Sequence, residues 1–325
     1  MSLTDNKANP LPDSGIRAAL QPWGLERAEY QLISHSENVV YKVLLGKDRY
    51  ILRIHRPGYN TIEELESEHL WTQALNAAGI RTPAQIQSQS GNYYHELEIG
   101  HDDGAGNVRA VGVMEWLEGT QLAEAPGTET YQSLGVLIAQ LHNHSSSWIT
   151  PNTFRRRSWN ADGLMGIRPL WGQFWMSAAL TKDESNFLAN VRKGLHAQLA
   201  SLPTSPELYG LIHADLHPHN VLVVGRDLFA IDFDDCGFGW HCYDIAVALH
   251  QIRDNDDFEY YESALLAGYR SIRSLPDAET LLPLFYLVRS LVGLGWISAR
   301  PELATIDNVR ERVPAILREA ETFTQ

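Results

Sequence analysis

The stretch Leu211-Ile212-His213-Ala214-Asp215-Leu216-His217-Pro218-His219-Asn220-Val221-Leu222, followed shortly by Ala230-Ile231-Asp232-Phe233-Asp234-Asp235, decides how this sequence is interpreted. Its first part fits the pattern H-x-D-x-x-x-x-N, and its second part places an aspartate directly after an apolar run. Two short apolar segments, 221–224 and 228–231, are joined by the turn sequence Gly225-Arg226-Asp227. The stretch therefore predicts a β-hairpin that Asn220 enters and Asp232 leaves.

Phosphoryl transfer is the chemistry that this pattern favours. The reaction needs a carboxylate that orients the attacking hydroxyl and accepts its proton, together with oxygen ligands for the magnesium that bridges the phosphates. Asp215 fits the first role, and Asn220 and Asp232 fit the second. Because a hairpin returns its two ends to the same place, we expect the side chains of Asn220 and Asp232 to converge on one Mg²⁺ ion beside the catalytic base Asp215.

The three histidines of the stretch, His213, His217 and His219, allow a rival interpretation as a zinc site. Two imidazoles four residues apart can share a metal ion on a helix, but Pro218 disfavours a regular helix here. We expect His213 instead to pack beneath the loop as an uncharged, hydrogen-bonding side chain.

The segment resembles the aminoglycoside phosphotransferase and choline kinase family, which has the protein-kinase-like fold. The resemblance rests on His213–Asn220, on Ile231-Asp232-Phe233 and on Tyr243-Asp244-Ile245-Ala246, with Ala214 where the family usually has glycine. It implies an ATP-dependent kinase that transfers phosphate to an alcohol group, with ATP and Mg²⁺ as cofactors. It also implies that Asp244 braces the catalytic loop by hydrogen bonds.

The order of predicted elements indicates an α+β, two-lobed fold. A β-hairpin over 39–54, a helix over 61–78 and strands near 93–99 and 109–116 form a small β-rich lobe. Helices follow over 131–141, 187–199 and beyond Asp244, and a tryptophan-rich stretch over 158–176 is predicted to be mostly loop. We expect a nucleotide-binding lobe over 1–114, with a loose leader over 1–15, and a catalytic and acceptor-binding lobe over 115–325.

The resemblance also assigns nucleotide-binding residues in the first lobe. The segment Ser34-His35-Ser36-Glu37-Asn38 is the expected phosphate-covering loop, with the Ser36 hydroxyl as a ligand. Arg53 stands where the family most often has the phosphate-binding lysine, and Glu68 is its expected partner, with Glu64 as the second choice. The segment 114–119 is the expected hinge, where the adenine would pair with the backbone at Met114, Glu115 and Leu117.

Composition and charge limit the choice of partners. The chain has 325 residues and a net charge of 26 − 40 = −14, which disfavours a nucleic-acid partner. Two cysteines are too few for a disulfide scaffold, and neither a signal peptide nor an uninterrupted apolar run of about 18 residues is visible. We expect a cytoplasmic protein that does not bind a membrane, and the sequence does not indicate its oligomeric state.

The phosphate acceptor is expected to be a small molecule with a hydroxyl group, such as an amino alcohol or a sugar-like or homoserine-like compound. Asp235, Trp240 and His241 follow the metal-binding aspartate and are candidates for the acceptor pocket, which Trp159, Trp171, Trp175, Arg289 and Trp296 could also line. A protein Ser/Thr kinase of the stress-response type is one alternative, although only residues 233–243 separate Asp232 from Asp244, which is short for an activation segment. A nucleotide-binding pseudokinase is the other, supported only by Arg53 in place of lysine.

Overall fold

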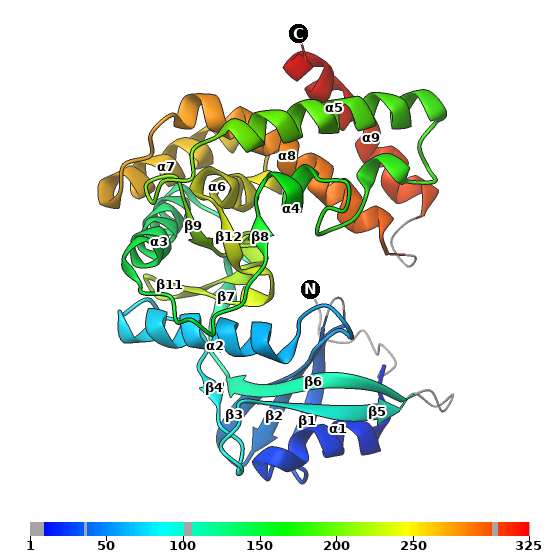
Figure 1. Ribbon diagram of the computed structural model, residues 1–325. Coiled ribbons are helices and arrows are strands. Elements are labelled where there is room, and N and C mark those ends of the chain that lie inside the picture. The colour runs from blue at the N-terminus through cyan, green and yellow to red at the C-terminus, as the bar shows by residue number, and fades with distance from the viewer. Residues whose placement is uncertain (1–9, 36–37, 101–105, 301–304, 325) are drawn as a thin grey trace. The chain divides into compact units, whose positions relative to one another are not determined.

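The computed structural model describes residues 10–35, 38–100, 106–300 and 305–324. Within them the chain divides into two compact units, each taken by itself below (Figure 1). The N-terminal unit runs to Gly119 and includes Thr150–Arg155, and the C-terminal unit comprises Thr120–Ile149 and the chain from Arg156 onward. The units thus divide after Gly119 rather than after Met114, and a short later segment returns to the first unit.

An antiparallel sheet forms the framework of the N-terminal unit. Its strand order is β1-β2-β3-β6-β4, and β5 pairs with the same long strand β6. The predicted hairpin is β2 and β3, with Leu45 paired to Asp48 across the turn and a positive φ at Gly46. The strands are β1 (Glu29–His35), β2 (Val39–Leu45), β3 (Asp48–Ile54), β4 (Gln85–Ile86), β5 (Tyr94–Gly100) and β6 (Gly106–Glu115).

The core of this unit lies on one face of the sheet. Alternate residues of β2 and β3, such as Tyr41 and Leu52, are buried there, as expected for a sheet with one covered face. The helix α1 (Asp13–Leu20) adds Ile16, Ala19 and Leu20 to the same core. The prediction of a loose leader over 1–15 was therefore wrong for residues 11–15, and residues 1–9 lie outside the described chain. The buried residues of α1 lie just beyond the predicted leader, so the polar composition of residues 11–15 concealed the start of the helix.

The helix predicted over 61–78 is α2 (Ile62–Ala77). Thr61 caps its N-terminus through a reciprocal pair of hydrogen bonds with Glu64, and Gly79, with φ +83°, follows its last turn. Leu65, Trp71 and Leu75 form its buried side. Glu68 is buried on the same helix, which is unusual for an acidic residue and indicates a paired charge.

Helices make up most of the C-terminal unit. Two glycines let α3 and α7 approach closely, because a Cβ at Gly135 would lie 1.9 Å from the Leu265 carbonyl oxygen and one at Gly268 would lie 1.9 Å from that of Gln132. The helices are α3 (Thr128–Ser147), α4 (Ala161–Met165), α5 (Lys182–Ser201), α6 (His241–His250), α7 (Phe258–Ile272), α8 (Ala278–Ser298) and α9 (Ile306–Thr324).

Two small sheets lie among these helices. In the first, β10 (Val221–Val224) lies between β11 (Asp227–Ala230) and β7 (Thr120–Gln121), so the hairpin predicted around Gly225 is present. In the second, β12 (Gly237–Trp240) pairs with β9 (Tyr209–Ile212) and β8 (Ser158–Trp159). The tryptophan-rich stretch contributes β8, α4 and the short 3₁₀ helix η3 (Phe174–Met176), joined by irregular segments.

One helix of the described chain is long and apolar enough to cross a membrane. This helix is α8, and 78% of its most apolar 18-residue window is buried inside the protein. Burial of this kind is what the central helix of a soluble protein shows, so length and composition alone are weak support for a membrane span.

Candidate active site

The hairpin β10–β11 positions the polar residues of the motif. Val221 pairs with Ala230, and the Ile231 amide donates a hydrogen bond to the Asn220 carbonyl oxygen at 3.0 Å. The backbone of Asn220 therefore lies directly beside the residue that precedes Asp232. Asp232 has φ 65° and ψ 66°, a left-handed conformation that is uncommon for residues other than glycine and often marks functional positions.

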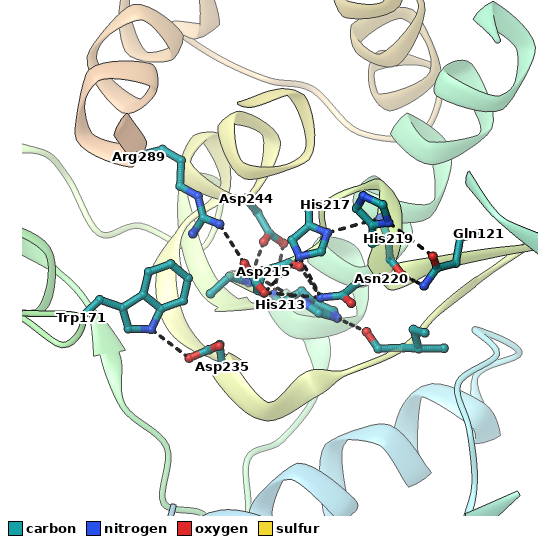
Figure 2. A network of polar contacts seen from close by, with 12 residues as sticks. Gln121, Trp171, His213, Asp215, His217, His219, Asn220, Asp235, Asp244 and Arg289 are labelled. Carbon is teal, nitrogen blue, oxygen red and sulfur yellow. Dashed lines mark hydrogen bonds and ion pairs between the residues drawn. The ribbon is translucent and has the colours of Figure 1, made fainter. Parts of the chain in front are cut away.

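The Asp215 carboxylate is surrounded by donors in the C-terminal unit (Figure 2). Arg289 donates from Nη2 to its Oδ1 at 2.8 Å, and His217 Nε2 lies 3.4 Å from its Oδ2. The Asn220 side-chain amide donates to the Asp215 carbonyl oxygen at 2.9 Å. Asp215, Asn220 and His217 thus form one cluster on a single loop, and Arg289 joins it from α8.

These contacts determine the protonation state of Asp215. Burial opposes the ionised form, but the hydrogen bond and charge of His217 and the charge of Arg289 outweigh it and lower the pKa of the carboxyl. The residue is therefore a carboxylate at neutral pH. It can accept a hydrogen bond from a hydroxyl group, which is the ground-state requirement of a base in phosphoryl transfer.

The loop that carries Asp215 is braced from α6. The buried Asp244 carboxylate accepts hydrogen bonds from the backbone amides of His213 (3.1 Å) and Ala214 (2.7 Å). Ala214 has φ 67°, so these bonds hold a non-glycine residue in the left-handed region. His142 on α3 lies 3.2 Å from the same carboxylate, a contact that no local pattern in the sequence indicated.

Each motif histidine has a different partner. His213 is buried, its Nε2 lies 3.0 Å from the Ile231 carbonyl oxygen, and burial lowers its pKa, so the ring is uncharged. His217 contacts Asp215, and His219 contacts Gln121. Across residues 10–35, 38–100, 106–300 and 305–324, no three His, Cys, Asp or Glu side chains form a group that could hold a metal ion. The zinc interpretation therefore has no structural support in this part of the chain.

A magnesium site of the kind predicted would use oxygen atoms of Asn220 and Asp232. The Asn220 Nδ2 group is engaged with the Asp215 backbone, which turns the amide oxygen away from that contact and leaves it available as a ligand. Asp232 lies at the adjoining end of the hairpin and would supply an anionic oxygen. The donor chemistry therefore fits a hard divalent cation, with further ligands coming from nucleotide phosphates and water.

The residues proposed for the acceptor pocket separate into two groups. Asp235 lies near the cluster, because its Oδ1 accepts from Trp171 Nε1 at 3.3 Å and the Trp171 ring lies under Arg289 (Figure 2). Trp240 and His241 are buried elsewhere in the unit. Trp240 donates to the Pro203 carbonyl oxygen and packs against Phe285, and His241 stacks on His142. The proximity of these two residues to Asp235 in sequence suggested a pocket position that their side chains do not occupy.

The N-terminal unit contains the residues expected to bind nucleotide. Arg53 Nη1 lies 3.6 Å from Glu68 Oε1, and the exposed fractions of the two side chains are only 8% and 5%. Glu64, the second choice as partner, is instead used in the cap of α2. Ser36 lies outside the described residues, and Ser34 and His35 belong to the end of β1 rather than to a loop.

The expected hinge, 114–119, begins with the last two residues of β6 and continues beyond the strand. Met114 is a buried residue that pairs with Ile51 of β3, and the Glu115 amide donates to the Ala84 carbonyl oxygen at 2.9 Å. The Lys42 ammonium lies 3.8 Å from the centre of the Trp116 ring. This cation–π contact holds the Trp116 side chain, which lies between Glu115 and Leu117 in the sequence, against β2. The first two residues of the segment are thus held by backbone pairing in the sheet, and Trp116 is held by packing of its side chain.

Comparisons with known proteins agree with this architecture. The family model described as "Phosphotransferase enzyme family" matches residues 29–278. The chain belongs to this phosphotransferase family. It is accordingly an ATP-dependent phosphotransferase with a kinase-like α+β fold.

Three relatives show how the family varies. The structure of a microcompartment-associated aminopropanol kinase is 31% identical, covers 96% of this chain and 98% of its own, and has a TM-score of 0.83. An amicoumacin kinase solved in complex with AMP-PNP, Ca²⁺ and Ami is 21% identical, with coverages of 94% and 92% and a TM-score of 0.79. A homoserine kinase of Brucella anthropi is 29% identical over 75% of this chain and 70% of its own length.

Proposed function

We propose that this chain is a small-molecule kinase that transfers the γ-phosphate of ATP to a hydroxyl group, with Asp215 as the catalytic base. The observation that carries the proposal is the cluster around Asp215. Its carboxylate is ionised, held in place by Arg289, and lies on the same loop as Asn220. A carboxylate in this state can orient an acceptor hydroxyl and take its proton as the bond to phosphorus forms.

Asn220 and Asp232 are assigned to the divalent cation, which we propose is Mg²⁺. When bound, this ion would neutralise charge on the nucleotide phosphates. A related kinase fold was solved with AMP-PNP and Ca²⁺, which supports a nucleotide and a divalent cation as cofactors. Arg53, held by Glu68, is assigned to phosphate contact, and the backbone at Met114, Glu115 and Leu117 is assigned to the adenine.

A small acceptor is favoured over a protein by the segment between Asp232 and Asp244. Its residues form the short 3₁₀ helix η5 (Phe233–Asp235), then β12, and then the start of α6. Because β12 pairs on both sides with β8 and β9, this segment is part of a sheet and offers no extended platform for a peptide. The relatives named above are kinases of aminopropanol, homoserine and amicoumacin, which are all small molecules.

The cytoplasm is the proposed location. Both cysteines, Cys236 and Cys242, are buried free thiols, as expected for a protein that works in a reducing compartment. Burial raises the pKa of the Cys242 thiol to about 12, so this group is unreactive.

Substitution of the proposed base and metal ligand tests the function. Transfer of labelled phosphate from ATP to a panel of small alcohols would be measured for wild type, Asp215→Ala and Asp232→Ala. We expect Asp215→Ala to lower kcat by at least ~100-fold with little change in the KM for ATP. Asp232→Ala should abolish turnover and its dependence on magnesium. Asp227→Ala is the control, because Asp227 is exposed at the turn of the same hairpin.

Three results would contradict the proposal. Full activity of Asp232→Ala would remove the metal assignment. ATP binding without any transfer that depends on Asp215 would indicate a pseudokinase. Labelling of peptides in place of small alcohols would favour the protein kinase alternative.

A further inference from the structure

Arg289 has only one role in the catalytic scheme, which is to hold the Asp215 carboxylate. It comes from α8, far from the motif in sequence, and is only 7% exposed. One of its nitrogens, Nη2, donates to Asp215 Oδ1. A guanidinium has five N–H donors, so this contact leaves most of its capacity unused.

The remaining nitrogens of Arg289 are buried without a standard hydrogen bond. Neither Nε nor Nη1 makes a hydrogen bond of standard geometry among the described residues, and the neighbouring Tyr243 hydroxyl interacts with the guanidinium without reaching that geometry. Leaving charged donors unsatisfied inside a protein is costly. A protein can retain such a cost in the unliganded state when a bound ligand supplies the missing acceptors and removes it.

The residues around Arg289 hold its guanidinium in one orientation and keep it charged. Its guanidinium lies 4.7 Å from the centre of the Trp171 ring, which fixes the plane of the fork (Figure 2). Burial opposes the charge of Arg289, but Tyr243 and Asp215 more than offset this effect and raise its pKa, so it stays a cation. A rigid, planar, charged fork beside the catalytic base matches the geometry of a carboxylate.

The nearby acid is already engaged with other groups. Asp235 Oδ1 lies 3.4 Å from Arg157 Nη1 and accepts the hydrogen bond from Trp171. Its negative charge is thus largely balanced, which makes it a poor receptor for an ammonium group. Beside Asp215, the charged group with donors left for an acceptor molecule is therefore the cationic guanidinium of Arg289.

We propose that Arg289 binds a carboxylate of the acceptor, so that the substrate is a small hydroxy acid whose hydroxyl lies at Asp215. This inference deepens the proposed kinase function and rests on it for the reaction. Arg289 would then both hold the base and fix the distance between the carboxylate of the substrate and its reacting hydroxyl, which favours one length of acceptor. The covalent chemistry is unchanged, because the hydroxyl oxygen attacks the γ-phosphorus, ADP leaves and Asp215 takes the proton.

A matched pair of probes isolates the carboxylate. L-Homoserine and 3-amino-1-propanol share the amine, the chain and the hydroxyl, and they differ only by the carboxylate. 4-Hydroxybutanoate keeps the carboxylate and lacks the amine. Binding of each would be measured by calorimetry with the whole protein, separately from turnover. We expect homoserine and hydroxybutanoate to bind at least ~10-fold more tightly than aminopropanol.

The variant Arg289→Gln tests the assignment to this residue. It should weaken binding of the two carboxylates by about 10- to 100-fold, the size expected for a charged hydrogen bond, and should narrow their advantage over aminopropanol. Arg253→Gln is a matched control, since Arg253 also lies 4.7 Å from an aromatic ring, that of Tyr286, and also pairs with an acid, Glu319. The control should retain the preference, and melting curves would establish that both variants fold.

Several outcomes would overturn the inference. These are tighter binding of aminopropanol by wild type, no binding of either carboxylate, or an equal loss for all three probes in Arg289→Gln, which would indicate a purely structural role. A change confined to the KM for ATP would assign Arg289 to the γ-phosphate instead. Carboxylate binding without any phosphate transfer would leave this inference intact and remove the proposed function.

Discussion

At the scale of single residues, the loop before Asp215 is held in a conformation that its sequence disfavours. Ala214 lies at φ 67°, where a Cβ atom is crowded by the backbone, and a hydrogen bond from its amide to Asp244 keeps it there. The bond to the neighbouring amide of His213 completes the clamp. Strain at this position is thus maintained by a buried carboxylate, and it sets the direction in which Asp215 leaves the backbone.

Glycine at position 214 should relieve this strain. We expect Ala214→Gly to raise the free energy of unfolding by about 0.5–1 kcal/mol, because the lost left-handed penalty exceeds the extra entropy of glycine in the unfolded chain. Ala246→Gly on the buried face of α6 is the control and should lower stability, since its backbone is helical. Urea denaturation of the three proteins measures the effect. Destabilisation by Ala214→Gly would show that the conformation at 214 is not strained.

At the scale of secondary-structure elements, the ion pair between β3 and α2 links two parts of the N-terminal unit. Arg53 and Glu68 are almost fully buried and lie 3.6 Å apart. A buried pair of this kind adds little net stability over an apolar pair, but removal of one partner leaves the other charge in a poor environment. The pair therefore fixes the position of the arginine more than it stabilises the fold.

A double-mutant cycle should reveal this arrangement. Arg53→Met and Glu68→Leu should each lower the free energy of unfolding by about 3 kcal/mol, whereas the double variant should lose less than the sum of the two. Arg53→Lys keeps the charge and should retain more phosphate transfer than Arg53→Met. Additive losses in the cycle would mean that the two charges do not depend on each other.

Some secondary-structure elements could be predicted from the sequence and others could not. The hairpin around Gly225 and the capped helix α2 follow from local turn and cap signals, and both were predicted correctly. The convergence of the Asn220 and Asp232 side chains on one ion stays a prediction. The strand β12 pairs with segments remote in sequence, and its glycines carry little strand propensity, so it was not predicted. His142 contacts Asp244 across 102 positions, a distance over which a single sequence gives no signal.

At the scale of the whole molecule, the pH dependence of stability follows from several buried, uncharged histidines. His142 and His241 stack with 4.1 Å between their ring centres, and His213 packs beneath the catalytic loop. Burial lowers the pKa of each, that of His241 to about 2, and it lowers the pKa of His250 to about 3. Asp244 titrates in the opposite sense, since burial raises the pKa of its carboxyl.

Acid should therefore destabilise the protein from mildly acidic pH downward. Above about pH 6.5 these histidines are neutral in both states and have no effect on the pH dependence. Below it they are protonated in the unfolded chain more than in the folded one, so each lowers stability. For His241 and His250, whose pKa values fall to about 2 and about 3, this amounts to about 1.4 kcal/mol each at pH 5.5, and the loss grows until the folded-state pKa is reached. Urea denaturation between pH 7.5 and 5.5 measures the slope.

Removal of one titrating group gives the decisive comparison. His241→Phe should reduce the slope by about one proton, that is by about 1.4 kcal/mol per pH unit at the acidic end, whatever its effect on stability at pH 7.5. Tyr209→Phe alters the same core, where its hydroxyl bonds the Phe238 carbonyl oxygen, without removing a group that titrates in this range. An unchanged slope in His241→Phe would contradict this prediction, because it would mean that His241 also takes up a proton in the folded protein over this pH range. The stacked rings of His142 and His241 would then tolerate a positive charge.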